Sequence, residues 1–161
     1  MAQQAHKEQE QQGAVTQWVT FSLAEETYGI DVMRVQEVLP MSEIAPVPGA
    51  PPYVLGIINL RGNVVTVIDT RMRFGLQSRE SDNASRIVVI ETGDQVAGIL
   101  VDSVAEVINV SEGEVDTAPN VGNDESSKYI YGVVSRGDEL LILVDVDKLL
   151  SREEWEEISS L

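Results

Sequence analysis

Apolar residues recur at every second position near the start of this 161-residue chain. Within Gln17–Leu23, each second residue from Val19 onward is apolar. A period of two is typical of a β-strand with one buried face. An acidic pair then turns the chain into Thr27–Val32, which we expect to pair with the first strand as a hairpin.

Short apolar runs separated by turn residues continue to residue 144 and predict further strands. In Asp31–Leu39, both a short helical turn and a continued strand fit, and the valines favour the strand. Leu140–Val144 is apolar throughout, so we expect both of its faces to be covered. The other strands are expected at Leu55–Leu60, Val64–Ile68, Arg86–Glu91, Gln95–Val101, Val104–Val110 and Tyr129–Val134.

Helical and irregular segments lie between and after these strands. Asp69 or Thr70 is placed to cap a short helical turn. Ser151 and Glu154 have the spacing of a capping box for a C-terminal helix, which we place at residues 152–161. Prolines predict an extended loop at residues 46–52, and polar composition predicts a linker at 77–85 and a second loop at 116–127. Residues 1–13 are polar and Gln-rich, and we expect a disordered tail there.

The two halves of the chain resemble each other. Residues 29–38 align with residues 98–107 without gaps, and six of ten positions are identical. Residues 56–69 resemble residues 132–145: each has a strand, an Arg-Gly turn, an apolar strand and an aspartate that opens a helical turn. Two similarities in the same order predict an internal duplication, with halves at roughly 14–80 and 86–151. Short strands with frequent turns then predict a mainly β fold of two small five-stranded barrels, with a groove between them.

Composition narrows the possible functions. The net charge of −16 disfavours binding to nucleic acids and to anionic membranes. No cysteine is present, which fits a reducing compartment, and the N-terminal residues have no apolar core of a signal peptide. No apolar stretch approaches the ~18–20 residues needed to span a bilayer. We therefore expect a cytoplasmic protein.

The residues of common catalytic and cofactor sites are scarce. The single histidine, His6, lies in the expected disordered tail, so neither a catalytic triad nor a His-ligated metal site is indicated. Glycine-rich phosphate loops and the Gly-x-Ser-x-Gly elbow are absent from the sequence. Asp145 and Asp147 resemble a fragment of a calcium loop, but its glycine and distal glutamate are missing, and helix capping by Asp145 is the better interpretation. The sequence predicts a binding module with no enzymatic activity, no cofactor and no metal.

The segment Gly56–Gly62 is the most informative motif. It predicts a buried strand that ends at a hairpin turn containing Arg61. There the guanidinium reaches solvent or a partner carboxylate. An arginine that only pins the turn is the alternative interpretation.

In this segment and in several others, the chain resembles the CheW family, the coupling proteins of bacterial chemotaxis. The similarity covers about residues 15–151 and depends on several motifs in a fixed order. One departure is Thr70, where the family usually has leucine after the aspartate. The motifs are Tyr28–Asp31 with Val35 and Glu37, the proline-rich loop, Asn59–Gly62, Val101–Val104, and Leu140–Asp145 with Lys148–Leu150.

The resemblance implies a fold, a function and partners. The fold would be two SH3-like five-stranded β-barrels with short helices and a C-terminal helix. The function would be that of an adaptor, coupling methyl-accepting chemoreceptors to the chemotaxis histidine kinase in signalling arrays. The implied partners are the cytoplasmic tip of the receptors and the kinase's regulatory, CheW-like domain, so the protein would lie at the membrane only through its partners. The resemblance and apolar character imply partner binding by Val35, Glu37, Val38 and Arg61; core packing is the alternative for the two valines.

Other functions remain open from sequence. The chain could be the coupler of another chemosensory system, such as one that controls pilus-based motility or gene regulation. A carboxylate-dependent hydrolase would need two close acidic groups in a deep pocket. A purely structural oligomer would need a large apolar self-interface. Glu106, which aligns with Glu37, is a weaker candidate for partner binding.

Overall fold

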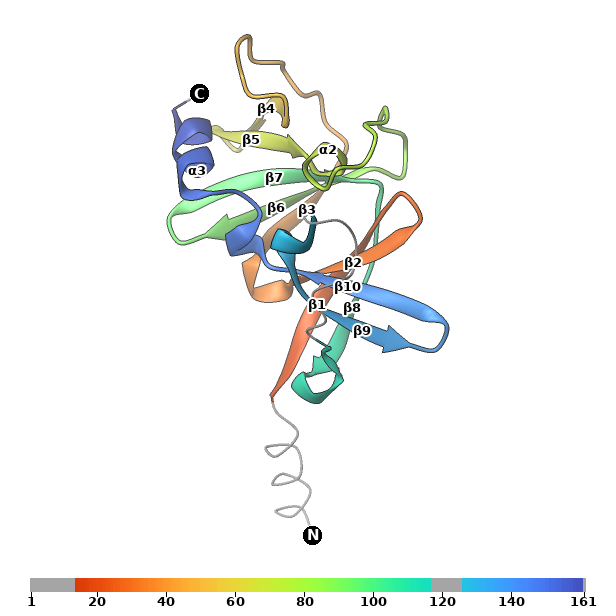
Figure 1. Ribbon diagram of the computed structural model, residues 1–161. Helices are drawn as coiled ribbons and strands as arrows, with labels where there is room; N and C mark the ends of the chain where they lie inside the picture. Colours follow the sequence, from red (N-terminus) through yellow and green to blue (C-terminus); the bar gives the residue numbers. More distant parts are fainter. Residues whose placement is uncertain (1–13, 117–125, 161) are drawn as a thin grey trace.

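The computed structural model describes residues 14–116 and 126–160. Within these residues, ten β-strands form two five-stranded sheets, accompanied by short helical segments and a C-terminal helix (Figure 1). The predicted mainly β fold is therefore confirmed. The expected tail at residues 1–13 and most of the second polar loop lie outside the described residues.

One sheet, called sheet A, has the strand order β8-β1-β2-β10-β9. Only β2 and β10 run parallel, and the other neighbours are antiparallel. Nearly all strand positions follow the apolar runs of the sequence. The strands are β1 (Val15–Leu23), β2 (Glu26–Asp31), β8 (Ser103–Ser111), β9 (Ile130–Arg136) and β10 (Glu139–Val144).

The other sheet, called sheet B, has the order β3-β6-β7-β5-β4, and only β5 and β7 run parallel. A 3-10 turn, η1 (Val32–Arg34), precedes β3, so the segment 31–39 contains both structures that its sequence allowed. The strands are β3 (Val35–Pro40), β4 (Val54–Leu60), β5 (Asn63–Asp69), β6 (Arg86–Thr92) and β7 (Gln95–Val101).

Each sheet contains strands from both halves of the duplication. We call residues 15–73, from β1 through helix α2 (Thr70–Arg73), the first repeat. The second repeat is residues 86–148, from β6 through the 3-10 turn η4 (Val146–Lys148). Sheet A combines β1 and β2 of the first repeat with β8, β9 and β10 of the second, and sheet B does the reverse. The expectation that each sequence half forms its own barrel is therefore wrong: after its second strand, each repeat crosses to the other sheet.

Equivalent residues of the two sheets have equivalent partners in the neighbouring strands. Gly29 of β2 lies opposite Leu143 of β10, and the equivalent Gly98 of β7 lies opposite Val67 of β5. A Cβ on Gly98 would come within 2.9 Å of Ile87, so this crossing accepts only glycine without a shift. The amide of Asp69 donates to the carbonyl of Tyr53 at 2.8 Å. The same bond, also at 2.8 Å, joins Asp145 to Tyr129, 76 residues later in each case.

Among the described residues, the apolar core has three parts. The largest, which we call the central cluster, joins the two sheets through fully buried side chains such as Phe21, Ile30, Ile68 and Ile99. Smaller clusters lie within sheet A, around Trp18 and Leu143, and within sheet B, around Ile58 and Val67. Burial of each large apolar side chain contributes about 1.5–3 kcal/mol. The central cluster lies between the two sheets, where the sequence suggested a groove.

The predicted helix caps are confirmed. The side chain of Asp69 accepts from the amide of Met72, and that of Asp145 accepts from the amide of Asp147. The last helix, α3 (Arg152–Ser159), begins with the capping box formed by Ser151 and Glu154. This helix packs on the central cluster through Trp155 and Ile158. The remaining 3-10 turns are η2 (Glu112–Glu114) and η3 (Ser126–Tyr129).

Candidate functional site

Strand β3, at the edge of sheet B, carries three of the four residues expected to bind partners. Side chains along β3 alternate between half-buried and exposed, because a strand presents successive residues to opposite faces. Val35 packs against the central cluster and is half-buried. Val38 points outward and is 39% exposed. The structure therefore favours packing for Val35, whereas Val38 is available to a partner.

Arg61 is held in an unusual backbone conformation. It occupies the two-residue turn between β4 and β5, with a φ of 52°, and Gly62 follows with a φ of 86°. Two successive positive φ angles are typical of the type I′ turn of hairpins, which favours asparagine or glycine. The side chain of Asn59 supports the turn by accepting from the amide of Gly62 at 2.8 Å. A positive φ is a strained conformation for a residue that carries a side chain.

Glu37 and Arg61 form a bidentate ion pair. The Nη1 atom of Arg61 donates to Oε2 of Glu37 at 2.6 Å, and Nη2 donates to Oε1 at 2.8 Å. The hydrogen bonds from Arg61 lower the pKa of Glu37, and the bonds to Glu37 raise the pKa of Arg61. The side chain of Arg61 is 71% exposed and that of Glu37 is 24% exposed. The pair therefore presents ordered charges at the surface, with the guanidinium outermost.

This ion pair joins the two edges of sheet B. Strands β3 and β4 are the first and last in the sheet order, so the contact shows that the sheet curls until its edges meet. A backbone bridge between Ala45 and Ile57 closes another part of the same seam. The sheet therefore resembles a barrel, but one with an open seam instead of a continuous ladder.

Sheet A has a seam of the same kind. There, Arg136, the last residue of β9, donates to the carbonyl of Asn109 in β8 and lies 3.3 Å from Glu114. The strand registers show that Arg61 is equivalent to Gly137, and Arg136 to Leu60. The Arg-Gly dipeptides aligned from sequence are thus offset by one residue. Of these two seams, the seam of sheet B has the bidentate carboxylate–guanidinium pair, whereas the contact of Arg136 with Glu114 is longer.

Sequence reasoning missed one exposed apolar residue on the matching edge of sheet A. Val107 in β8 is 52% exposed, and the repeat alignment pairs it with Val38. Its neighbour Glu106 is exposed as well, and its backbone is bonded to the hydroxyl of Thr20. The sequence signal was present, because six of ten residues around these positions are shared by the repeats.

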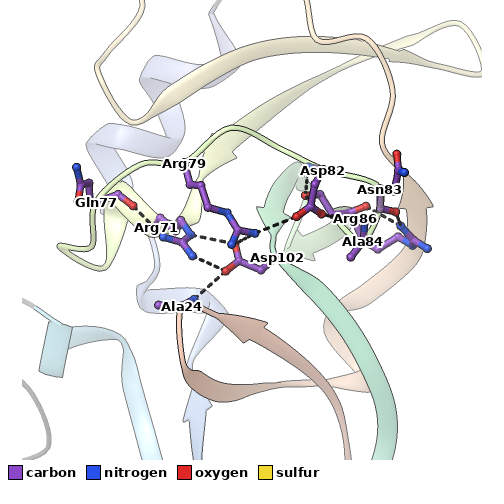
Figure 2. A network of polar contacts seen from close by, with 10 residues as sticks. Ala24, Arg71, Gln77, Arg79, Asp82, Asn83, Ala84, Arg86 and Asp102 are labelled. Carbon is purple, nitrogen blue, oxygen red and sulfur yellow. Dashed lines mark hydrogen bonds and ion pairs between the residues drawn. The ribbon is translucent and has the colours of Figure 1, made fainter.

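A second polar cluster holds the linker of residues 77–85 (Figure 2). Asp102, between β7 and β8, accepts two hydrogen bonds from Arg71, at 2.6 and 2.9 Å, and one from the amide of Ala24. Arg79 of the linker lies 3.6 Å from the same carboxylate. Hydrogen bonds from Arg71 lower the pKa of Asp102, while burial acts in the opposite direction. This linker is therefore attached to the second repeat by specific contacts.

Neither a metal site nor a membrane-spanning helix is found among the described residues. Residues 14–116 and 126–160 contain no group of three His, Cys, Asp or Glu side chains placed to hold a metal ion. In the same ranges, no helix has the length and apolar character needed to cross a membrane. Of the four residues expected to bind partners, Glu37 and Arg61 are the charged ones, and they contact each other.

The fold and this site define a β binding module, built by internal duplication, whose candidate contact residues lie on a sheet edge. The family model of the CheW-like domain matches residues 17–154, so the chain belongs to the CheW-like domain family. It is 38% identical over 149 residues to a chemotaxis protein CheW of Treponema pallidum, covering 90% of this chain and 88% of that protein. A chemotaxis protein CheW of Klebsiella aerogenes is 35% identical, with 86% and 83% covered.

A solved structure supports the same assignment. The scaffolding protein TtCheW of Thermoanaerobacter tengcongensis superposes with a TM-score of 0.78 at 35% identity. The match covers 88% of this chain and 91% of that one. The similarity therefore includes both sheets and their crossovers.

Proposed function

We propose that this chain is a non-enzymatic chemotaxis adaptor that couples chemoreceptors to the chemotaxis histidine kinase. The observation that carries the proposal is the family match over residues 17–154, which includes nearly the whole described fold. The similarity to a protein described as a scaffold supports the same role. In this role the chain acts in the cytoplasm and reaches membrane-bound arrays through its partners.

The edge of sheet B formed by β3 and the β4–β5 turn is our proposed contact surface. Val38 supplies exposed apolar area, and the pair of Glu37 and Arg61 supplies charges in a fixed geometry. Ordered charges at an interface chiefly set specificity and association rate. Val35 supports this surface without touching the partner, since its packing on the central cluster fixes the position of β3.

The proposed partners are the regulatory, CheW-like domain of the kinase and the cytoplasmic tip of the chemoreceptors. A partner built from the same kind of curled sheet offers edges of similar shape, and a helical receptor tip offers an apolar stripe. Array signalling needs several reversible contacts in place of one tight contact. The exposed Val107, equivalent to Val38, is a second contact candidate under this proposal.

The test is calorimetric titration of the kinase's regulatory domain with the wild-type protein and three variants. We expect saturable one-to-one binding by the wild type and loss of binding by Arg61→Glu with its far-UV circular dichroism unchanged. The double variant Glu37→Arg/Arg61→Glu restores an ion pair of reversed polarity. Binding restored by this variant would show that the pair acts by holding the seam; binding still lost would show that the charges contact the partner.

A matched control uses the seam of sheet A. Arg136→Glu removes an exposed arginine from the equivalent hairpin, where the carboxylate contact is longer, at 3.3 Å. We expect this variant to bind the kinase domain like the wild type. Absence of saturable heat with both the kinase domain and a receptor-tip fragment, at concentrations up to roughly 100 μM, would overturn the proposed function.

A further inference from the structure

Two ion pairs join the first repeat to the second at equivalent places in the fold. In one, Arg71 lies two residues after the capping Asp69 and binds Asp102, with Nη2 and Oδ2 2.6 Å apart. In the other, Asp147 lies two residues after the capping Asp145 and binds Arg34 at 2.8 Å. Both pairs connect the start of a short helical turn to the segment where the other repeat crosses between the sheets.

The two pairs have opposite polarity. A shift of 76 residues, which superposes the capping aspartates, brings Arg71 onto Asp147. A shift of 69 residues, which aligns the crossovers, brings Arg34 to within one residue of Asp102. The first repeat therefore carries both arginines, and the second repeat carries both aspartates.

We propose that these four charges allow each repeat to pair only with a repeat of the other kind. The two repeats have the same strand topology, so two copies of the first repeat could in principle form the same pair of sheets. That arrangement would place Arg34 of each copy against Arg71 of the other. Two second repeats would place Asp102 against Asp147 in the same way. Like charges at close range oppose both wrong pairings, and opposite charges favour the correct one.

Burial makes the first of these contacts effective. The side chains of Arg71 and Asp102 are only 14% and 15% exposed, so solvent screens them weakly. Arg34 and Asp147 are 39% and 48% exposed and contribute less. A third contact acts in the same direction: Arg73 donates from Nε to the carbonyl of Leu149, which directly follows the second repeat and lies 76 residues after Arg73, the same shift that superposes the capping aspartates. A pairing of two first repeats would bring two Arg73 side chains together at this point.

The ion pairs at the two sheet seams do not discriminate in this way. Glu37 and Arg61 belong to the first repeat, and Glu114 and Arg136 belong to the second. A contact within one repeat is kept whether that repeat pairs with a first repeat or with a second repeat. They therefore provide a matched control for the contacts between repeats.

The test compares refolding of full-length variants over a range of protein concentrations. The variant R34D/D147R keeps an ion pair at this place in the correctly closed monomer, but gives each repeat one charge of each sign. The control R136E/E114R makes the same kind of reversal within one repeat. Each protein is diluted from urea, and the fractions of monomer and dimer are measured by size-exclusion chromatography with light scattering. In some dimers, the first repeat of one chain pairs with the second repeat of the other chain. These dimers keep the native contacts, so they form equally in all variants and set the baseline.

We expect R34D/D147R to refold with on the order of tenfold more dimer than the wild type at the same concentration, because each wrong pairing gains two attractive contacts in place of two repulsive ones. The neutral variant R34Q/D147N should fall between them, and R136E/E114R should match the wild type. Equal dimer fractions in the wild type and both Arg34 variants would overturn the proposal. An equal increase in the control and the reversed variant would overturn it as well. Urea unfolding of the purified monomers checks that their stabilities are comparable.

Discussion

Arg73 and Glu154 join the first repeat to the C-terminal helix through two hydrogen bonds, each 2.6 Å long. The guanidinium also lies 5.0 Å from the ring centre of Tyr53 and 5.3 Å from that of Tyr129. These tyrosines are repeat equivalents, so Arg73 sits between the two halves of the duplication. Glu154 serves twice, since it also accepts from the amide of Ser151 in the capping box. One carboxylate thus both starts α3 and fixes it to the sheets.

Acid should loosen this attachment. Burial alone would raise the pKa of Glu154, but the bonds from Ser151 and Arg73 outweigh it, and the pKa is lowered from its usual 4.5. A lowered pKa in the folded state means that the stabilisation is complete above pH 4.5 and is lost as the pH falls through the folded pKa. We expect the emission of Trp155, isolated in a Trp18→Phe background, to shift to the red below about pH 4.5.

Glu154→Gln tests the same attachment at neutral pH. We expect a loss of about 1 kcal/mol in the free energy of unfolding, because the amide keeps part of the hydrogen bonding of a pair whose side chains are 16% and 23% exposed. The control is Glu156→Gln on the exposed side of the same helix, which should leave the urea midpoint unchanged. Equal midpoints for both variants would contradict the assigned role of Glu154.

Replacing Arg61 by glycine should separate its structural role from its contact role. Glycine adopts the positive φ of this turn without steric cost, so removing the side chain also removes backbone strain. We expect the melting temperature of Arg61→Gly to stay within roughly 3 °C of wild type, while binding to the kinase domain is lost. A much lower melting temperature would instead show that the ion pair across the seam holds the fold.

Thr70 is a site where a substitution should stabilise the protein. Its side chain is completely buried, and its hydroxyl has no hydrogen-bond partner, whereas the equivalent residue in the second repeat is Val146. A buried hydroxyl without a partner costs about 1–3 kcal/mol. We expect Thr70→Val to raise the free energy of unfolding by about 1 kcal/mol, measured by urea titration.

Thr20→Val is the matched control for Thr70→Val. The hydroxyl of Thr20 donates to the carbonyl of Glu106 at 2.8 Å and accepts from its amide at 3.1 Å. The same chemical change should therefore destabilise the protein by about 1 kcal/mol at this position. Changes of the same sign at both positions would count against the hydrogen-bond explanation.

The exchange of strands predicts that cutting the linker will not separate the repeats. A protease site inserted between Glu80 and Ser81 lies in an exposed part of the linker. After cleavage, four strand pairings still join the two fragments: β1 with β8, β2 with β10, β3 with β6, and β5 with β7. We expect the fragments to elute together in native size-exclusion chromatography and to part only in denaturant. Separation under native conditions would show that the two repeats fold independently.

Local patterns in the sequence determined the elements of this fold. The expected strand Gln95–Val101 has the observed bounds, because alternation and turn residues act within a few positions. The caps at Asp69 and Ser151 were equally predictable, since a cap depends on residues no more than three positions apart. The duplication was visible because both copies kept residues, such as Gly29 and Gly98, whose space is set by the opposite strand.

Only the tertiary structure decided which strands share a sheet. The parallel pairing of Thr27 in β2 with Leu141 in β10 joins residues far apart in the chain, and no local pattern records it. The contact between Glu37 and Arg61 likewise needed the curl of sheet B, and the half-burial of Val35 needed the central cluster. Periodicity shows which face of a strand is apolar, but the partner of that face depends on the packing of the whole chain.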